Sequence, residues 1–206
     1  MIESQLKPCG IVSTRLSQAF FQVAREQYVG AGRRGLAYND APQPLGNGRE
    51  LLAPLSLGLL LEEAAVQPHE HVLVVGATTG YSAAILSHLA SSVVALECDA
   101  GLADAARGNL RGLTNVSVVE GRLDGGWADG APYDVVLIDG AVEEQPSGLV
   151  SQLAEGGRMF AILAGADGVR RAARGVRRSQ SLSLEPFAEA QGSLLPSFGK
   201  APQFRF

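Results

Sequence analysis

Apolar residues along this chain form short continuous runs that alternate with segments of helical spacing. The run Val72–Val75 is mostly β-branched and has no polar break, which predicts a strand buried on both faces of a parallel sheet. It ends at Gly76, and residues 80–90 then have the spacing of a helix with one apolar side. A second apolar run over residues 92–97 ends in Glu97. This order predicts a strand, a tight turn, a helix and a parallel strand.

The same alternation continues beyond this unit. Further helices are predicted over residues 14–29, 54–65, 100–110 and 148–154, and further strands over 116–119, 134–138 and 157–163. The Gly- and Pro-rich segment 30–48 predicts a long ordered loop without regular structure. Residues 179–187 alternate polar and apolar side chains, which predicts an antiparallel strand, and 201–206 is a candidate to pair beside it. We therefore predict an α/β fold with a doubly wound, mostly parallel Rossmann-like sheet, an antiparallel C-terminal hairpin and an N-terminal helical extension.

Length and composition add a domain prediction and limit the choice of partner. The 206 residues predict one domain, with residues 1–66 forming helices and a loop that pack on it. Lys and Arg number 17 against 21 Asp and Glu, and this net charge of −4 disfavours nonspecific nucleic-acid binding. The arginines of residues 170–178 are interpreted as a solvated hairpin or exposed face.

Several common features are missing from the sequence pattern. No apolar run approaches the roughly 18 residues that a membrane-spanning helix needs. The N-terminus has no basic start followed by an apolar block. Two isolated cysteines and three scattered histidines indicate neither a disulfide framework nor a metal site. We expect a cytoplasmic protein without a membrane anchor or bound metal, and the oligomeric state stays open.

The turn after the first parallel strand is the candidate cofactor site. Two glycines let the backbone turn tightly and let a ligand approach it, and helix amides there can face nucleotide oxygens. Glu97 follows about 20 residues later, where a carboxylate can bind ribose hydroxyls. A dinucleotide pattern needs glycines at 76, 78 and 81, whereas an S-adenosylmethionine pattern needs them at 76, 78 and 80. Gly76 and Gly80 fit the second pattern better, although a turn that binds nothing remains an alternative.

Several segments in a fixed order extend this interpretation to the whole chain. They are residues 33–40 (RRGLAYND), 44–48 (PLGNG), 53–54 (AP), the turn 76–81, 96–97 (LE), Gly121 with 126–127 (GW), 131–134 (APYD) and 152–157 (QLAEGG). Together they resemble the protein-L-isoaspartate O-methyltransferases from about residue 4 to the C-terminus. The resemblance implies a methyltransferase sheet, S-adenosylmethionine as methyl donor, and a carboxylate of altered aspartyl residues in protein or peptide as acceptor.

The resemblance also assigns candidate site residues. The donor site would comprise Gly76, Ala77, Thr78, Gly80, Tyr81, Glu97, Arg122 and Asp124. The acceptor side would comprise Tyr38, Asp40, Leu52 and Pro54. The turn would lie against the amino-acid end of the donor, and Glu97 would accept hydrogen bonds from its ribose. The main task of the enzyme would be to hold a carboxylate in line with the methyl carbon.

The chain departs from the family pattern at four places. Leu52 stands where a serine hydroxyl would help to place the acceptor, so the catalytic residues stay unknown. Val74 replaces an acid, Thr78 replaces the middle glycine, and Arg122 stands where an aspartate would meet the adenine unless Asp124 takes over. Each lost hydrogen-bonding partner costs on the order of 1 to 3 kcal/mol.

Three functions are therefore compared. The first is an S-adenosylmethionine-dependent methyltransferase of this family that transfers a methyl group to a protein or peptide carboxylate. The second is a catalytically degenerate family member that acts as a binding or scaffold protein. The third, a nicotinamide-dependent oxidoreductase, is disfavoured because residue 81 is tyrosine and no catalytic Tyr-Lys or Cys-His pairing is visible.

Overall fold

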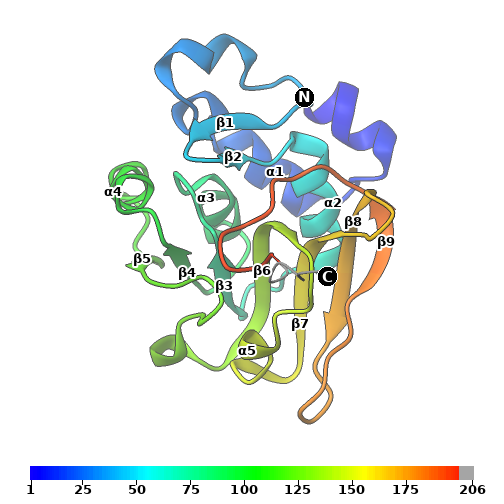
Figure 1. The fold of residues 1–206 in the computed structure, drawn as a ribbon. Helices are drawn as coiled ribbons and strands as arrows, with labels where there is room; N and C mark the ends of the chain where they lie inside the picture. Colours follow the sequence, from blue (N-terminus) through cyan, green and yellow to red (C-terminus); the bar gives the residue numbers. More distant parts are fainter. Residues whose placement is uncertain (200–206) are drawn as a thin grey trace, which may run out of the picture.

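The computed structural model describes residues 1–199 and contains a seven-stranded sheet covered by helices (Figure 1). This sheet contains β3 (His71–Val75), β4 (Ser92–Glu97), β5 (Val116–Glu120), β6 (Tyr133–Val142), β7 (Leu153–Ala164), β8 (Arg170–Val176) and β9 (Glu185–Glu189). A separate two-stranded sheet contains β1 (Gln43–Gly46) and β2 (Arg49–Leu51). The α-helices are α1 (Thr14–Gln22), α2 (Pro54–Ala64), α3 (Tyr81–Ser87), α4 (Ala100–Asn109) and α5 (Ser147–Val150). Helical turns of the 3-10 or π type cover Ile2–Leu6, Lys7–Cys9, Arg25–Gln27, Ala31–Leu36 and Ala128–Gly130.

The order of the strands positions the candidate site. The order of strands in the sheet is β5-β4-β3-β6-β7-β8-β9. The first five strands are parallel, β8 is antiparallel to β7, and β9 is antiparallel to β8. From β3 the chain proceeds outward to β4 on one side and later begins β6 on the other. The carboxyl ends of β3 and β6 thus form the switch point where ligands bind in folds of this class. The predicted mostly parallel Rossmann-like sheet with antiparallel C-terminal strands is confirmed.

The two faces of the sheet are covered by different elements. Val72 and Val74 belong to the cluster of buried residues formed with α1, α2 and α3. Leu73 and Val75 belong to a second cluster, formed with α5 and with parts of the C-terminal segment that include Leu195. Because successive side chains of a strand point to opposite faces, the continuous apolar run in β3 serves both clusters.

The N-terminal part forms a layer beside the carboxyl ends of the parallel strands, at the top of Figure 1. Helix α2 begins at Pro54, where the missing N–H of proline costs no hydrogen bond. It is buried along most of its length. The hairpin of β1 and β2 lies in the same layer, and Asn47 and Gly48 in its turn both have positive φ.

Two predictions for this layer were wrong. The helix predicted over 14–29 ends at Gln22, because Val23 takes an extended conformation and the chain then turns at Arg25–Gln27. The segment 30–48 is not free of regular structure. It contains a helical turn at Ala31–Leu36 and strand β1, whose partner β2 follows directly.

In the C-terminal part, the observed helix and strand boundaries differ from the predicted ones. The segment 170–176, interpreted as a solvated hairpin or exposed face, is strand β8, whose arginines are exposed or half-buried while Ala172 and Ala173 face the core. The strand predicted over 179–187 is instead β9 at Glu185–Glu189. Helix α5 ends at Val150, short of the predicted 154, because β7 already begins at Leu153. The candidate strand 201–206 lies outside the described residues.

None of the helices within residues 1–199 combines the length and the apolar character that crossing a membrane requires.

Candidate functional site

The turn after β3 has the tight geometry that the sequence predicts. Gly76 and Gly80 have φ of 81° and 95°, and Thr78 between them has φ of 52°. This left-handed region favours glycine, so the threonine adopts there a conformation that β-branched residues rarely take. The amides of Gly76 and Ala77 donate to the carbonyl of Leu96, at 2.9 and 3.0 Å. These two amides therefore hold the turn on β4 rather than face the crevice.

Glu97, at the end of β4, is fully buried and surrounded by donors. Its Oε2 accepts from the amide of Thr78 at 2.7 Å, and its Oε1 accepts from the amides of Cys98 and Asp99 at 2.8 and 3.0 Å. Burial alone would raise the pKa of Glu97, but hydrogen bonds and charge from Arg49 outweigh it and hold the pKa below its usual range. Glu97 is therefore an ionised carboxylate.

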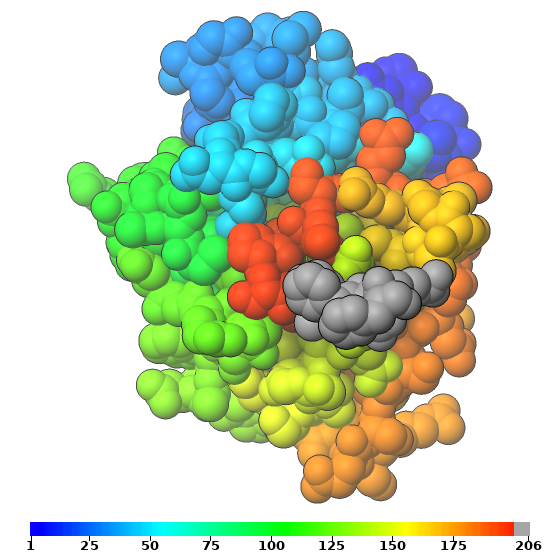
Figure 2. All heavy atoms as spheres, in the orientation of Figure 1, coloured from blue at the N-terminus to red at the C-terminus, as the bar shows by residue number. Residues whose placement is uncertain are grey.

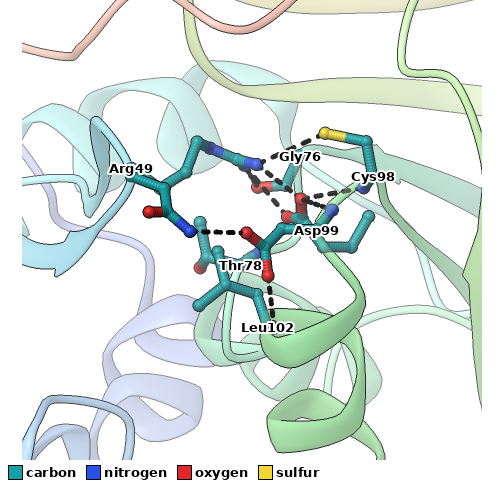
Figure 3. Close-up of polar contacts among 8 residues, drawn as sticks. Arg49, Gly76, Thr78, Cys98, Asp99 and Leu102 are labelled. Atoms are coloured by element: carbon teal, nitrogen blue, oxygen red, sulfur yellow. Dashed lines mark hydrogen bonds and ion pairs between the residues drawn. The ribbon is translucent and has the colours of Figure 1, made fainter.

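Arg49, in β2, occupies the remaining binding capacity of this carboxylate. Its Nη1 and Nη2 donate to the two oxygens of Glu97 in a bidentate ion pair, the second at 2.9 Å. Figure 3 shows the guanidinium directed also at Gly76, whose carbonyl accepts from Nη2 at 3.2 Å, and at Cys98. The internal arginine thus makes the hydrogen bonds that a ribose would be expected to make with Glu97.

A second contact fixes the hairpin that carries Arg49. Asn47, in the β1–β2 turn, donates through Nδ2 to Oδ2 of Asp99 at 3.0 Å. Asp99 is the N-cap of α4, and its Oδ1 accepts from the amide of Leu102 at 3.0 Å. The hydrogen bond from Asn47 contributes most to the lowered pKa of Asp99. The hairpin is therefore bound at two points to the segment that joins β4 and α4.

The C-terminal segment packs against the carboxyl ends of β3 and β6. The amide of Ala141 in β6 donates to Ser193 at 2.8 Å, and the amide of Leu195 donates back to Ala141 at 2.9 Å. The Leu195 side chain packs so closely that a Cβ built on Gly76 would lie 3.0 Å from it, and one built on Gly140 only 2.6 Å. The red segment after β9 accordingly crosses β6 in Figure 1 and lies against the cyan atoms of the hairpin region in Figure 2.

The other predicted donor-site residues contact groups of the protein itself. Tyr81, at the start of α3, is buried against Tyr28, with ring centroids 5.3 Å apart. Arg122 and Asp124 form an ion pair with each other on the loop after β5, with Nη2 and Oδ2 2.7 Å apart. A role of Asp124 at the adenine would thus require the carboxylate to change partners. That role stays a prediction.

Three of the four predicted acceptor residues lie at the start of α2, and Tyr38 contacts other parts of the N-terminal layer. Asp40 accepts from the amide of Leu55 at 2.9 Å and so caps this helix, which Pro54 begins. The Tyr38 hydroxyl donates to Glu26. Leu52 is buried, and its carbonyl accepts from Arg25 at 2.6 Å. Ser56, one turn beyond, accepts from the amide of Gln191 at 2.9 Å, so its hydroxyl is already engaged.

Three buried charged residues near the turn were not predicted as site residues. They are Arg25, Arg49 and Asp139. Asp139 lies in β6, and its Oδ2 accepts from Oγ of Ser82 at 2.5 Å. Burial raises the pKa of Asp139 to about 6, against the opposing effects of Ser82 and of Arg49 and Arg25. A sequence signal existed only for Arg49, which lies three residues before Leu52, where the chain departs from the family pattern.

Comparison with known proteins agrees with the resemblance. A family model described as Protein-L-isoaspartate(D-aspartate) O-methyltransferase (PCMT) matches residues 1–185. A protein-L-isoaspartate O-methyltransferase of Koribacter versatilis is 43% identical over 161 residues, which cover 77% of this chain and 72% of the relative. One of Methylorubrum populi is 37% identical over 190 residues, 90% of each chain.

Solved structures show the same fold. A protein-L-isoaspartate O-methyltransferase structure matches with a TM-score of 0.82 and 24% identity, covering 93% of this chain and 63% of that one. A Plasmodium falciparum beta-aspartate methyltransferase, solved in complex with S-adenosyl-L-homocysteine, matches with a TM-score of 0.77 and 18% identity, covering 92% and 94%.

Proposed function

We propose that this chain, which belongs to the protein-L-isoaspartate O-methyltransferase family, is an S-adenosylmethionine-dependent methyltransferase that acts on a carboxylate of a protein or peptide. The observation that carries the proposal is the placement of Glu97 beside the Gly76–Gly80 turn. The turn lies at the switch point between β3 and β6, where this class of fold binds nucleotide-like ligands, and Glu97 ends the neighbouring strand β4.

The residues present fit the donor once Arg49 leaves Glu97. Glu97 would then accept hydrogen bonds from ribose hydroxyls, and Gly76 would allow close approach of the amino-acid end. Both changes require the guanidinium of Arg49 and the side chain of Leu195 to move away from the turn. Donor binding is therefore expected to be coupled to displacement of the β1–β2 hairpin and of the segment that contains Leu195.

The chemistry asks little of the protein beyond positioning. When bound, S-adenosylmethionine supplies a methyl group on a positively charged sulfur, which a carboxylate oxygen can take without a proton having to move. The side chains at the start of α2 would hold that carboxylate in line with the methyl group. Leu52 offers no hydrogen bond from its side chain, so another group has to replace the expected hydroxyl.

A second candidate is a family member that has lost donor binding and serves as a binding protein. It is favoured by one observation, the bidentate pair of Arg49 with Glu97. A charge pair this deeply buried is difficult to open, because each ion would lose its partner before it regained water.

Methyl transfer from radiolabelled S-adenosylmethionine to an isoaspartyl peptide tests the proposal, with the same peptide carrying ordinary aspartate as the control. Transfer to the isoaspartyl peptide alone would support it. Binding of S-adenosylhomocysteine without transfer to either peptide would show that the acceptor is wrong. No binding of S-adenosylhomocysteine at millimolar concentration would favour the second candidate.

A further inference from the structure

Arg25 is a fully buried arginine that contacts both the turn of residues 76–81 (the donor turn) and the segment of residues 52–54 (the acceptor segment). It follows α1 in the turn Arg25–Gln27, and three parts of the chain converge on its guanidinium. Nε donates to the carbonyl of Ala37 at 2.7 Å, and Nη2 donates to the carbonyl of Leu52 at 2.6 Å. The ring of Tyr81 lies below the guanidinium, 4.7 Å from Cζ to the ring centroid.

The charge of Arg25 has no anionic partner at contact distance. Within residues 1–199 it forms no ion pair, and its Nη1 is buried without a hydrogen-bond acceptor. Burial lowers the pKa of Arg25, while the charge interaction and hydrogen-bonding contact with Tyr81 and, more weakly, the charges of Asp139 and Asp40 counteract this. A guanidinium stays charged in proteins, and leaving such a charge buried and unpaired is strongly destabilising. A free donor of this kind is suited to an anion that arrives from outside.

Two other buried atoms without partners belong to the same turn. They are the Tyr81 hydroxyl and Oγ1 of Thr78. Buried polar atoms are almost always satisfied by protein, water or ligand. The unsatisfied atoms on Arg25, Tyr81 and Thr78, of which the Tyr81 hydroxyl lies close to the Arg25 guanidinium, therefore mark a buried region that a polar ligand group can complete.

An open groove lies beyond the segment that Arg25 holds through the carbonyl of Leu52. A cavity of about 230 Å³ is lined by Asp40, Ala53 and Ser56 on one side and by residues 189–191 on another. Ala53 directly follows Leu52, whose carbonyl Arg25 holds. A peptide that lies in this groove can bring a side-chain carboxylate toward Arg25 when the acceptor segment shifts.

We propose that Arg25 binds the carboxylate of the acceptor through its free Nη1 and so replaces the hydroxyl that Leu52 lacks. The proposal rests on the proposed function for the identity of the acceptor. The planar guanidinium is suited to this task because it can hold a carboxylate with directed hydrogen bonds while it stays fixed to Ala37 and Leu52. Arg25 is then an acceptor-binding residue and determines that a carboxylate is chosen over an amide.

The first test compares two peptides that differ only in charge. Calorimetric titration measures binding of an isoaspartyl pentapeptide and of the same peptide with the side-chain carboxylate converted to an amide. Wild type is expected to prefer the carboxylate by about tenfold or more, since a charged hydrogen bond is at stake. Arg25→Gln is expected to bring the two affinities within about twofold. Arg25→Lys, which keeps the charge but not the planar guanidinium, is expected to retain part of the preference for the carboxylate.

Arg15→Gln is the matched control. Arg15 also holds two backbone carbonyls, of Val66 at 3.0 Å and of Leu89 at 2.8 Å, but it does not contact the turn or the acceptor segment. Its loss should lower stability without changing the preference for the carboxylate. In the unmutated protein, side-chain nitrogen resonances of Arg25 should shift on addition of the isoaspartyl peptide and not on addition of the amide. This measurement does not depend on the folding of any variant.

The outcomes separate this inference from the proposed function. A carboxylate preference that depends on Arg25, without methyl transfer, would support the inference and contradict the activity. Methyl transfer with an unchanged KM for the isoaspartyl peptide in Arg25→Gln would support the activity and overturn the inference. No preference in wild type, or the same preference in Arg25→Gln, would also overturn it.

Discussion

Arg49 and Arg25 are both buried beside the turn after β3, yet they differ in what neutralises them. Arg49 forms a bidentate pair with Glu97, a carboxylate that three backbone amides also bind. Arg25 donates to two carbonyl oxygens and lies over an aromatic ring, and its Nη1 has no hydrogen-bond acceptor. The first arrangement is complete without a ligand. The second is not.

The difference separates a closed site from an open one. On the donor side every strong acceptor of Glu97 is engaged, so a ligand has to compete with an internal group. On the acceptor side a strong donor is left over, so a ligand adds an interaction that the protein lacks. Burial of a charge is therefore not by itself a sign of a binding site. The presence or absence of a counter-charge decides.

The largest expected effect comes from Glu97→Gln. It leaves Arg49 buried without its carboxylate, and breaking one partner of such a pair costs about 3 to 5 kcal/mol. Urea unfolding at neutral pH measures the loss. The double variant Glu97→Gln with Arg49→Gln should recover part of it, because no unpaired charge remains. A decrease in unfolding free energy of less than about 1 kcal/mol in the single variant would mean that the ion pair does not stabilise the hairpin against Glu97 as its geometry indicates.

The next effect concerns Asp139, which lies within the electrostatic reach of Arg49, Arg25 and Glu97. Its pKa in the folded protein, about 6, exceeds the ordinary value of 3.8. The folded state therefore binds the proton more tightly, so stability falls as pH rises from about 4 to about 6. Asp139→Asn should remove this fall and stabilise the protein by about 1 to 3 kcal/mol at pH 8, with little change at pH 4.

Thermal or urea unfolding of both proteins across this pH range checks the prediction for Asp139. Ser82 should be kept in both, because its hydroxyl can also donate to asparagine. A difference between the two proteins that is the same at pH 4 and pH 8 would contradict the raised pKa.

The smallest expected effect is that of Thr78→Gly. Glycine adopts φ of 52° without the strain that a β-branched residue has there, and it keeps the amide that donates to Glu97. Stability should rise by about 1 kcal/mol. Thr79→Gly is the control, since it removes the hydrogen bond of Oγ1 to Tyr28 and should destabilise. A destabilising Thr78→Gly would show that the threonine methyl group packs more favourably than its backbone is strained.

Much of the fold could be predicted because its signals are local. The apolar run of β3, the glycines after it and the carboxylate that ends β4 lie within 27 residues, from His71 to Glu97. The β1–β2 hairpin was missed although Asn47-Gly48 is a recognised turn signal, because each strand is only three or four residues long. Strand β8 was missed because its arginines obscured two buried alanines.

The site itself was harder to predict, because its decisive contacts are long-range. Arg49 and Glu97 are 48 residues apart, and no periodicity indicates that they meet. Leu195 reaches Gly76 only after the chain has crossed the whole sheet. Arg25 was assigned to a long helix, on which its charge would have pointed to solvent. Sequence patterns locate the edge of the sheet that binds ligands, but not the groups that the protein itself places there.

Calorimetric titration of wild type and Arg49→Gln with S-adenosylhomocysteine tests the closed donor site most directly. Glutamine cannot neutralise Glu97, so the carboxylate becomes available to a ribose, and affinity should rise by about tenfold or more, as expected for one released charged hydrogen bond. Equal or weaker binding by Arg49→Gln would contradict the claim that Arg49 competes with the donor for Glu97.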